Sequence, residues 1–308
     1  MEKSYRLVTR SDFDGLVCAA LLKELDMIDD ILFVHPKDMQ DGKIPVSSGD
    51  ITTNLPYVDG VGMAFDHHVS ETYRVGLKPN HFILPDAPSA ARVVYEHFGG
   101  KTRFPRISDE LMAAVDKGDS AKFEMEDVLD PQGLDLLNFL MDARTGLGRF
   151  RTFRISNYQL MMELIDLCRT HSIEQILETP DVAERIALYR EQADLFRNQV
   201  ARCGKIHDRL VVLDLRDEEV IHAGNRFMIY ALFPVCSISM HVMWGRDKQN
   251  TVLAIGKSIF DRTNPVNVGE ICLRFGGGGH EAAGTCQISN ELADPTIEML
   301  IPILNGDA

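Results

Sequence analysis

The sequence lacks any hydrophobic run long enough to cross a lipid bilayer, and its first residues lack the apolar segment of a signal peptide. Its six cysteines are scattered, and no CxxC pair occurs among them. These absences argue against a membrane protein, a secreted disulfide scaffold and a zinc site of the CxxC type. We therefore expect a cytoplasmic protein with no membrane partner.

Positive charge is scarce, because 32 lysines and arginines stand against 46 aspartates and glutamates, which gives a net charge of −14. Proteins that track long nucleic acids usually present a basic face. An acidic chain can still contain a small positive cleft, and acidic surfaces also serve solubility alone. We expect no long duplex partner, but a small phosphorylated substrate or a short single-stranded oligonucleotide.

The order of apolar segments predicts an α/β fold. The length of 308 residues fits two domains, each able to bury its own core. Short apolar runs alternate with helical patterns in the first half, and a second set of strand patterns begins after residue 206. We predict three parts: a domain at 1–150 with a parallel sheet and helices on both faces, a helical linker at 151–203, and a smaller α/β domain at 204–308.

Acidic and imidazole side chains adjoin the predicted strands and helices of the first part. Asp12 and Asp14 follow the first strand and fit a hard cation, although one aspartate there could simply cap the next helix. Another strand ends at Asp66-His67-His68, and ligands of α/β folds bind at such strand ends. If these residues converge with Asp50 and Asp116, their oxygen and nitrogen ligands suit two cations, manganese better than zinc.

Two further segments fit an anion. Residues 142–154 contain Arg144 and three other arginines, which can form either a solvated hinge or a phosphate clamp. Between a predicted helix and a predicted strand lies a glycine run followed by His280, and such a run can cradle an anion with its N–H groups. Its members are Gly276, Gly277, Gly278 and Gly279.

Four of these segments together resemble the DHH phosphoesterase superfamily, in the branch that carries a C-terminal DHHA1 domain. They occur in the expected order over nearly the whole chain: Asp12-Phe13-Asp14-Gly15, Asp66-His67-His68, Asp116-Lys117-Gly118-Asp119, and Gly276 to His280. The family includes exopolyphosphatase-like proteins, phosphodiesterases of short oligonucleotides and RecJ-type exonucleases. Manganese-dependent pyrophosphatases share the first domain only, and the glycine run argues against that branch.

The resemblance implies a site with two divalent cations, Mn²⁺ or else Mg²⁺. The implied metal ligands are Asp12, Asp14, Asp50, His67 and Asp116, with Asp59 as the competing candidate for the place of Asp50. It further implies that Asp66 orients a histidine, and that His68 contacts the scissile phosphate or assists the leaving group. The glycine run, His280 and Arg262 would bind the rest of the substrate, with Arg144 as a further phosphate contact.

The implied function is hydrolysis of terminal phosphodiester or phosphoanhydride bonds of short oligonucleotides or nucleotides by a metal-activated water. Two alternatives stay open: an exopolyphosphatase, and a catalytically weak protein that binds a phosphorylated ligand. The second is favoured by Val8, because many relatives carry a metal-ligating histidine at that position. The sequence does not decide whether the protein is a homodimer.

Overall fold

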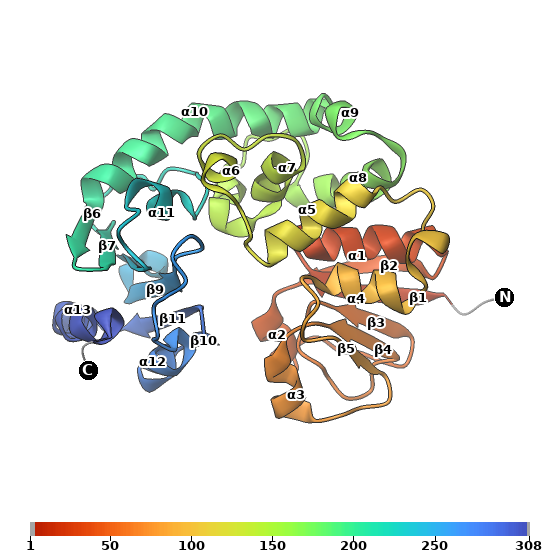
Figure 1. Cartoon of the computed structure of the whole chain (residues 1–308), viewed down its shortest axis with the longest axis horizontal. Coiled ribbons are helices and arrows are strands. Elements are labelled where there is room, and N and C mark those ends of the chain that lie inside the picture. Colours follow the sequence, from red (N-terminus) through yellow and green to blue (C-terminus); the bar gives the residue numbers. More distant parts are fainter. Residues whose placement is uncertain (1–3, 307–308) are drawn as a thin grey trace. The chain divides into compact units, whose positions relative to one another are not determined.

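The computed structural model describes residues 4–306, apart from the side chains of residues 69 and 70. The chain divides into two compact units, coloured along the sequence in Figure 1. Unit 1 comprises Met1–Phe123 and Pro131–Leu188, and unit 2 comprises Glu124–Asp130 and Tyr189–Ala308. Within residues 4–306, no helix combines the length and the apolar character that crossing a membrane requires.

Unit 1 is built on a five-stranded sheet with the order β2-β1-β3-β4-β5, in which every pair of neighbours is parallel. The strands are β1 (Tyr5–Arg10), β2 (Ile28–Val34), β3 (Asp50–Thr53), β4 (Met63–Asp66) and β5 (His81–Ile83). The parallel sheet predicted for the first domain is therefore confirmed.

The chain reverses its direction across this sheet after β2. It leaves β1 through α1 (Phe13–Glu24) to reach β2 on one side, and then returns through α2 (Pro36–Gln40) to β3 on the other side of β1. Because parallel crossovers are right-handed, these opposite directions place α1 and α2 on opposite faces of the sheet. The carboxyl ends of β1 and β3 thus flank the switch point at which such folds bind ligands.

Helix α1 is the central helix of unit 1. Its residues Phe13–Leu22 are all buried, since it contacts β1 and three other helices, α4 (Ala90–His97), α5 (Asp109–Asp119) and α8 (Asn157–Thr170). Asp12 caps its start by accepting a hydrogen bond from the Gly15 N–H at 2.9 Å. On the opposite face, Met39 of α2 packs in a cluster with Val8 and Val34.

Unit 1 contains further helices in addition to those already described. They are α3 (Val69–Val75), α7 (Gly133–Met141), α9 (Ile173–Leu177) and the first part of α10 (Pro180–Cys203). Residues 151–203, predicted as a helical linker, are divided between the two units, because α8 and α9 lie in unit 1 while α10 continues into unit 2. The predicted domain boundaries stay a prediction.

Unit 2 contains a six-stranded sheet with the order β10-β11-β9-β8-β7-β6, in which only β7 and β8 pair in parallel. The strands are β6 (Gly204–His207), β7 (Leu210–Asp214), β8 (Ile238–Trp244), β9 (Thr251–Lys257), β10 (Gly278–His280) and β11 (Ala283–Ile288). Its core joins these strands to α12 (Val268–Arg274) and α13 (Asn290–Asn305). Two short helices, α6 (Met125–Leu129) and α11 (Met228–Leu232), contact each other in this unit.

Candidate metal centre and phosphate site

The turn after β1 is fixed by a close approach of its own backbone. A Cβ atom on Gly15 would clash with the carbonyl oxygen of Arg10, so only glycine fits at this position. This turn places Asp12 just before α1 and Asp14 in the first turn of α1. Both carboxylates therefore lie beyond the carboxyl end of β1, as predicted.

Asp14 is held by the start of another helix. Its carboxylate accepts hydrogen bonds from the N–H groups of Ala90 at 3.0 Å and Ala91 at 2.8 Å, the first two residues of α4. A helix amino terminus stabilises a negative charge through these otherwise unpaired donors. The side chain is buried and has little freedom to move.

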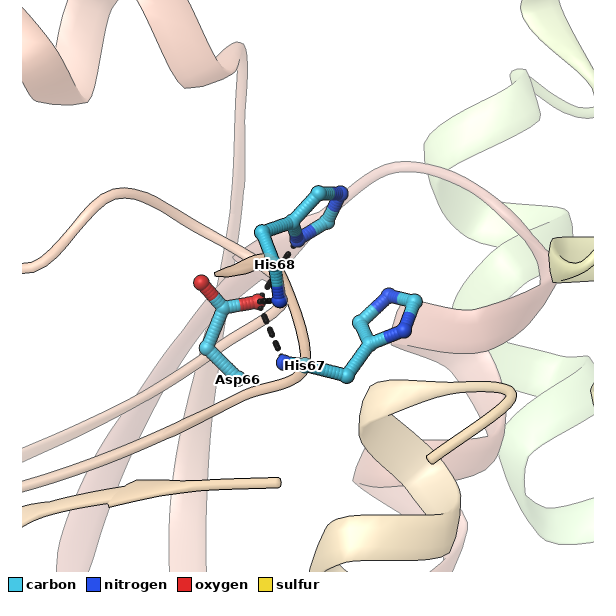
Figure 2. A group of neighbouring side chains, drawn as sticks. All are labelled: Asp66, His67 and His68. Atoms are coloured by element: carbon cyan, nitrogen blue, oxygen red, sulfur yellow. Dashed lines mark hydrogen bonds and ion pairs between the residues drawn. The ribbon is translucent and has the colours of Figure 1, made fainter. Parts of the chain in front are cut away.

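The end of β4 turns sharply around the carboxylate of Asp66, as Figure 2 shows. Its Oδ1 accepts hydrogen bonds from the backbone N–H of His67 at 2.8 Å, from that of His68 at 3.3 Å, and from Nδ1 of His68 at 2.7 Å. Because of this turn, the two adjacent imidazole rings have different surroundings. The ring of His68 is fixed against Asp66, whereas the ring of His67 points away from it.

His67 faces two carboxylates from other elements. Its Nδ1 donates to the carbonyl oxygen of Ala87 at 3.1 Å, and its Nε2 lies 2.9 Å from Oδ2 of Asp119, the last residue of α5. Asp14, His67 and Asp119 each offer one ligand atom, and these atoms lie within 4.8 Å of one another. One nitrogen and two carboxylate oxygens at this spacing can hold a divalent cation.

The electrostatics of this group indicate a place for positive charge. Burial, together with the charges of Asp119 and Asp12, raises the pKa of Asp14 well above its usual value, and burial also raises the pKa of Asp12. Burial lowers the pKa of His67, but the bond to Asp119 and its charge outweigh this effect, so the pKa rises to about 9. Crowded anions of this kind are stabilised either by a proton or by a cation.

The structure corrects the predicted place of Asp116. One turn before Asp119 in α5, its carboxylate accepts hydrogen bonds from Oγ of Ser89 at 2.7 Å and from Nη2 of Arg92 at 2.5 Å. Asp116 thereby fastens α4 to α5, and it is Asp119 that reaches His67. Both aspartates belong to the segment Asp116-Lys117-Gly118-Asp119, and which of them binds a metal stays a prediction.

Asp50 is also not brought to the cluster. It is the first residue of β3 and lies opposite Arg6 of β1, with which it forms an ion pair at 2.7 Å. This is the amino end of the parallel strands, and the cluster lies beyond their carboxyl ends. The competing candidate, Asp59, is exposed at the surface before β4 and pairs with Lys78 at 3.3 Å.

Two residues that the sequence did not single out lie beside Asp12. Asn54 directly follows β3, is buried, and has a φ of +53°. Its Nδ2 lies 3.5 Å from Oδ1 of Asp12, and its Oδ1 has no hydrogen-bond partner among the described residues. Arg10, the last residue of β1, places its Nε 2.9 Å from Oδ2 of Asp12. The rule that ligands bind at the carboxyl ends of strands would have found Asn54.

Arg144 is close enough to this group for its charge to act on Asp12 and Asp119. It lies in the 3₁₀ turn η2 (Ala143–Thr145), and its Nε donates to Oδ1 of Asp142 at 2.7 Å. A guanidinium held in this way beside carboxylates can contact a phosphate oxygen. By contrast, Arg154 of the same arginine-rich segment is paired with Asp181.

The glycine run lies in unit 2 and has a clear structural role. Gly276, at a φ of +73°, and Gly277 donate their N–H groups to the carbonyls of Leu273 and Cys272 at the end of α12. A Cβ on Gly277 or on Gly279 would clash with the backbone of β11. The predicted anion cradle therefore does not extend to the N–H groups of Gly276 and Gly277. The remaining members of the run, Gly278, Gly279 and His280, form the exposed edge strand β10.

Arg262 is exposed in the same unit, where its Nε donates to the carbonyl of Ile259 at 3.2 Å. This contact holds the guanidinium against the backbone of its own turn. Arg262 thus stays a predicted substrate contact.

A solved structure resembles the whole chain. The pGpG-specific phosphodiesterase PggH from Vibrio cholerae is 61% identical, with a TM-score of 0.86, over 99% of this chain and 100% of that chain. No protein-family model and no curated protein matches the sequence.

Two other solved structures are more distant. CDC45 from Entamoeba histolytica is 10% identical over 97% of this chain and 95% of that chain, with a TM-score of 0.49. RecJ from Thermus thermophilus, in complex with Mn²⁺, is 15% identical over 98% of this chain and 52% of that chain, with a TM-score of 0.46. These likenesses are too weak to support an argument. The likeness to PggH, together with the geometry at the ends of β1, β3 and β4, leads to one conclusion: the chain belongs to the DHH phosphoesterase superfamily and is a phosphohydrolase.

Proposed function

We propose that this protein is a divalent-metal-dependent phosphodiesterase that cleaves short single-stranded oligonucleotides, with pGpG, a guanine dinucleotide bearing a 5′ phosphate, as its preferred substrate. The observation that carries the proposal is 61% identity, over the full length of both chains, to a phosphodiesterase described as specific for pGpG. That relative is itself an enzyme, which favours catalysis over the binding-protein alternative.

A divalent cation fits the cluster of Asp14, His67 and Asp119. Because Nδ1 of His67 donates to a carbonyl, the lone pair of a neutral ring lies on Nε2, which faces the Asp119 carboxylate at 2.9 Å. Two lone pairs at this distance repel each other unless a proton or a cation lies between them. The mixed oxygen and nitrogen ligands fit Mn²⁺ best, and Mg²⁺ is the alternative.

The cation, when bound, would supply Lewis acidity, lowering the pKa of a coordinated water and offsetting charge on the phosphate. The chain's own residues would donate the proton to the leaving group and stabilise charge on the phosphate. Asp66 keeps the proton of His68 on Nδ1, and Nε2, the other ring nitrogen, points away from Asp66. A histidine oriented in this way can donate a proton from Nε2 to the leaving oxygen once both nitrogens are protonated. Arg144 would stabilise negative charge on the phosphate.

Unit 2 has its own predicted substrate-binding residues, which stay proposals. They are Gly278, Gly279 and His280 of the exposed edge strand, and Arg262. Glycines without side chains let a phosphate or a ribose approach the backbone closely. We also propose a cytoplasmic location, since the six cysteines are free. A homodimer and the exclusion of long duplexes stay predictions.

The test is a substrate panel with the purified protein and Mn²⁺. We expect GMP release from pGpG at a kcat/KM at least tenfold above that for pApA, and no measurable turnover of tripolyphosphate or pyrophosphate. Addition of EDTA should abolish the reaction, and Mn²⁺ in excess should restore it.

Other results would contradict the proposal in distinct ways. Faster hydrolysis of tripolyphosphate would indicate the exopolyphosphatase alternative. Tight binding of pGpG without turnover, at every divalent metal tried, would indicate a binding protein. Turnover of pGpG that survives complete chelation would remove the metal from the reaction.

A further inference from the structure

Both oxygens of the Asp12 carboxylate are contacted by donors of the protein. Its Oδ2 forms an ion pair with Nε of Arg10 at 2.9 Å. Its Oδ1 accepts the N–H of Gly15 at 2.9 Å and lies 3.5 Å from Nδ2 of Asn54. Every contact is with a donor, and one donor carries a full positive charge. Asp12 is therefore paired with a cation that the protein itself supplies.

Asp14 and Asp119 are in a different situation. Asp14 accepts backbone N–H groups, which carry only partial charges, and Asp119 faces the imidazole of His67. With His67 neutral, these two carboxylates carry two negative charges in a buried setting. One divalent cation balances this charge completely. A second divalent cation beside Asp12 would be placed next to the positive charge of Arg10, which repels it.

The groups around Asp12 also offer little to a second cation. Asn54 carries a neutral amide where a carboxylate would add charge, and its buried Oδ1 is unpartnered among the described residues. Val8 is a buried apolar residue in the cluster formed with α2, so it contributes no ligand. Arg10 is the residue that places positive charge beside Asp12.

We infer that this site binds one divalent cation, through Asp14, His67 and Asp119, and that the guanidinium of Arg10 takes the place of a second cation beside Asp12. This inference rests on the proposed metal-dependent function and specifies its metal content. In the reaction, Arg10 would act as a positioning residue that holds Asp12 and adds a fixed positive charge next to the phosphate.

The experiment counts metal ions in the intact protein. After equilibrium dialysis against Mn²⁺ and elemental analysis, we expect one ion per chain, with the electron paramagnetic resonance spectrum of an isolated Mn²⁺. Asp12→Asn should keep this ion with its dissociation constant changed less than about threefold, whereas Asp119→Asn should weaken binding more than about tenfold. Asp109→Asn, an exposed aspartate on the same helix, is the matched control.

Arg10 is tested by Arg10→Gln, with Arg6→Gln as its control, because Arg6 pairs with Asp50 at the other end of the same strand. We expect Arg10→Gln to admit a second, weaker Mn²⁺ at millimolar concentration and Arg6→Gln to admit none. Two ions per wild-type chain, or a spin-coupled pair in the spectrum, would overturn the inference. A folded Arg10→Gln protein that still binds one ion would remove the assigned role of Arg10.

These outcomes are distinguishable from failure of the proposed function. One bound ion without hydrolysis of pGpG leaves the inference intact and refutes the function. Metal-dependent hydrolysis with two bound ions supports the function and refutes the inference.

Discussion

Nε2 of His67 lies 2.9 Å from Oδ2 of Asp119, although the two residues come from the end of a strand and the end of a helix that are 52 positions apart in the sequence. This contact joins the end of β4 to the end of α5. It also defines the proposed ligand set, because the ligand atoms of Asp14, His67 and Asp119 lie within 4.8 Å of one another.

Replacing Asp119 should reduce turnover and metal binding, whereas replacing Asp116 should reduce the stability of the fold. Asp119→Asn should lower pGpG turnover at least about a hundredfold and weaken Mn²⁺ binding, because a ligand is lost. Asp116→Asn should instead cost stability, about 1–3 kcal/mol, since it removes the closer of the two carboxylates that pair with Arg92. Turnover by Asp116→Asn at saturating Mn²⁺ should stay within about threefold of wild type. Urea unfolding and kinetics separate the two variants, and equal losses of turnover would contradict the assignment.

His68 should affect turnover without affecting metal binding. His68→Gln is expected to lower kcat by about a hundredfold or more, because the proton donor held by Asp66 is lost. The dissociation constant for Mn²⁺, measured by calorimetry, should change little. His171→Gln, at an exposed position in the same unit, serves as the control. Loss of Mn²⁺ binding in His68→Gln would place this residue among the metal ligands instead.

Substitutions at two adjacent glycines of the run should distinguish a structural role from a role in substrate binding. Gly277→Ala should destabilise the protein by about 2 kcal/mol or more, because its Cβ would clash with the backbone of β11. A Cβ on Gly278 meets no atom within 4 Å, so Gly278→Ala should leave stability within about 0.5 kcal/mol of wild type. If the edge strand binds substrate, Gly278→Ala raises KM for pGpG. An unchanged KM would remove this strand from the proposed site.

The pH dependence of stability should report on His241 in β8. Burial lowers its pKa to about 4, below the value of about 6.5 for an unfolded chain. Between these two values the unfolded state binds a proton that the folded state does not, so stability falls as the pH falls from 6.5 towards 4 and is unaffected above 6.5. Because the ring is partly exposed, we expect a loss of the order of 2 kcal/mol.

The measurement for His241 is urea unfolding at about pH 7.5 and about pH 4.5. Other groups also titrate in this range, so the comparison is with His241→Gln, in which this part of the acid sensitivity should disappear. Equal pH dependence in both proteins would show that the histidine is not buried in its neutral form.

The sequence predicted the parallel sheet and the two motifs that begin the site, because apolar runs and the polar residues after them are local features. Asp14 and His67 were singled out in this way: His67 directly follows β4, and Asp14 lies in the first turn of the helix after β1. Asp50 is not brought to the cluster because it begins β3: the rule that ligands gather at the carboxyl ends of strands points to Asn54, four positions later. Asn54 has an uncharged amide side chain, so a pattern of charged residues does not include it.

The choice between Asp116 and Asp119 depended on information that local patterns do not contain. The two residues lie one turn apart on α5, so they face similar directions. Which of them meets His67 is decided by Ser89 and Arg92, which bind Asp116, and these contacts are long-range. The role of Arg10 was equally invisible, since a basic residue at a strand end normally faces solvent.

Asp14 accepts its two backbone hydrogen bonds from the first turn of α4 and at the same time contributes to the metal cluster. The same carboxylate is therefore both a capping group and a proposed metal ligand. A relative of this protein that had lost catalysis would still need a hydrogen-bond acceptor at this position to cap α4. The presence of this aspartate in a relative is therefore weak evidence that the relative is an active enzyme.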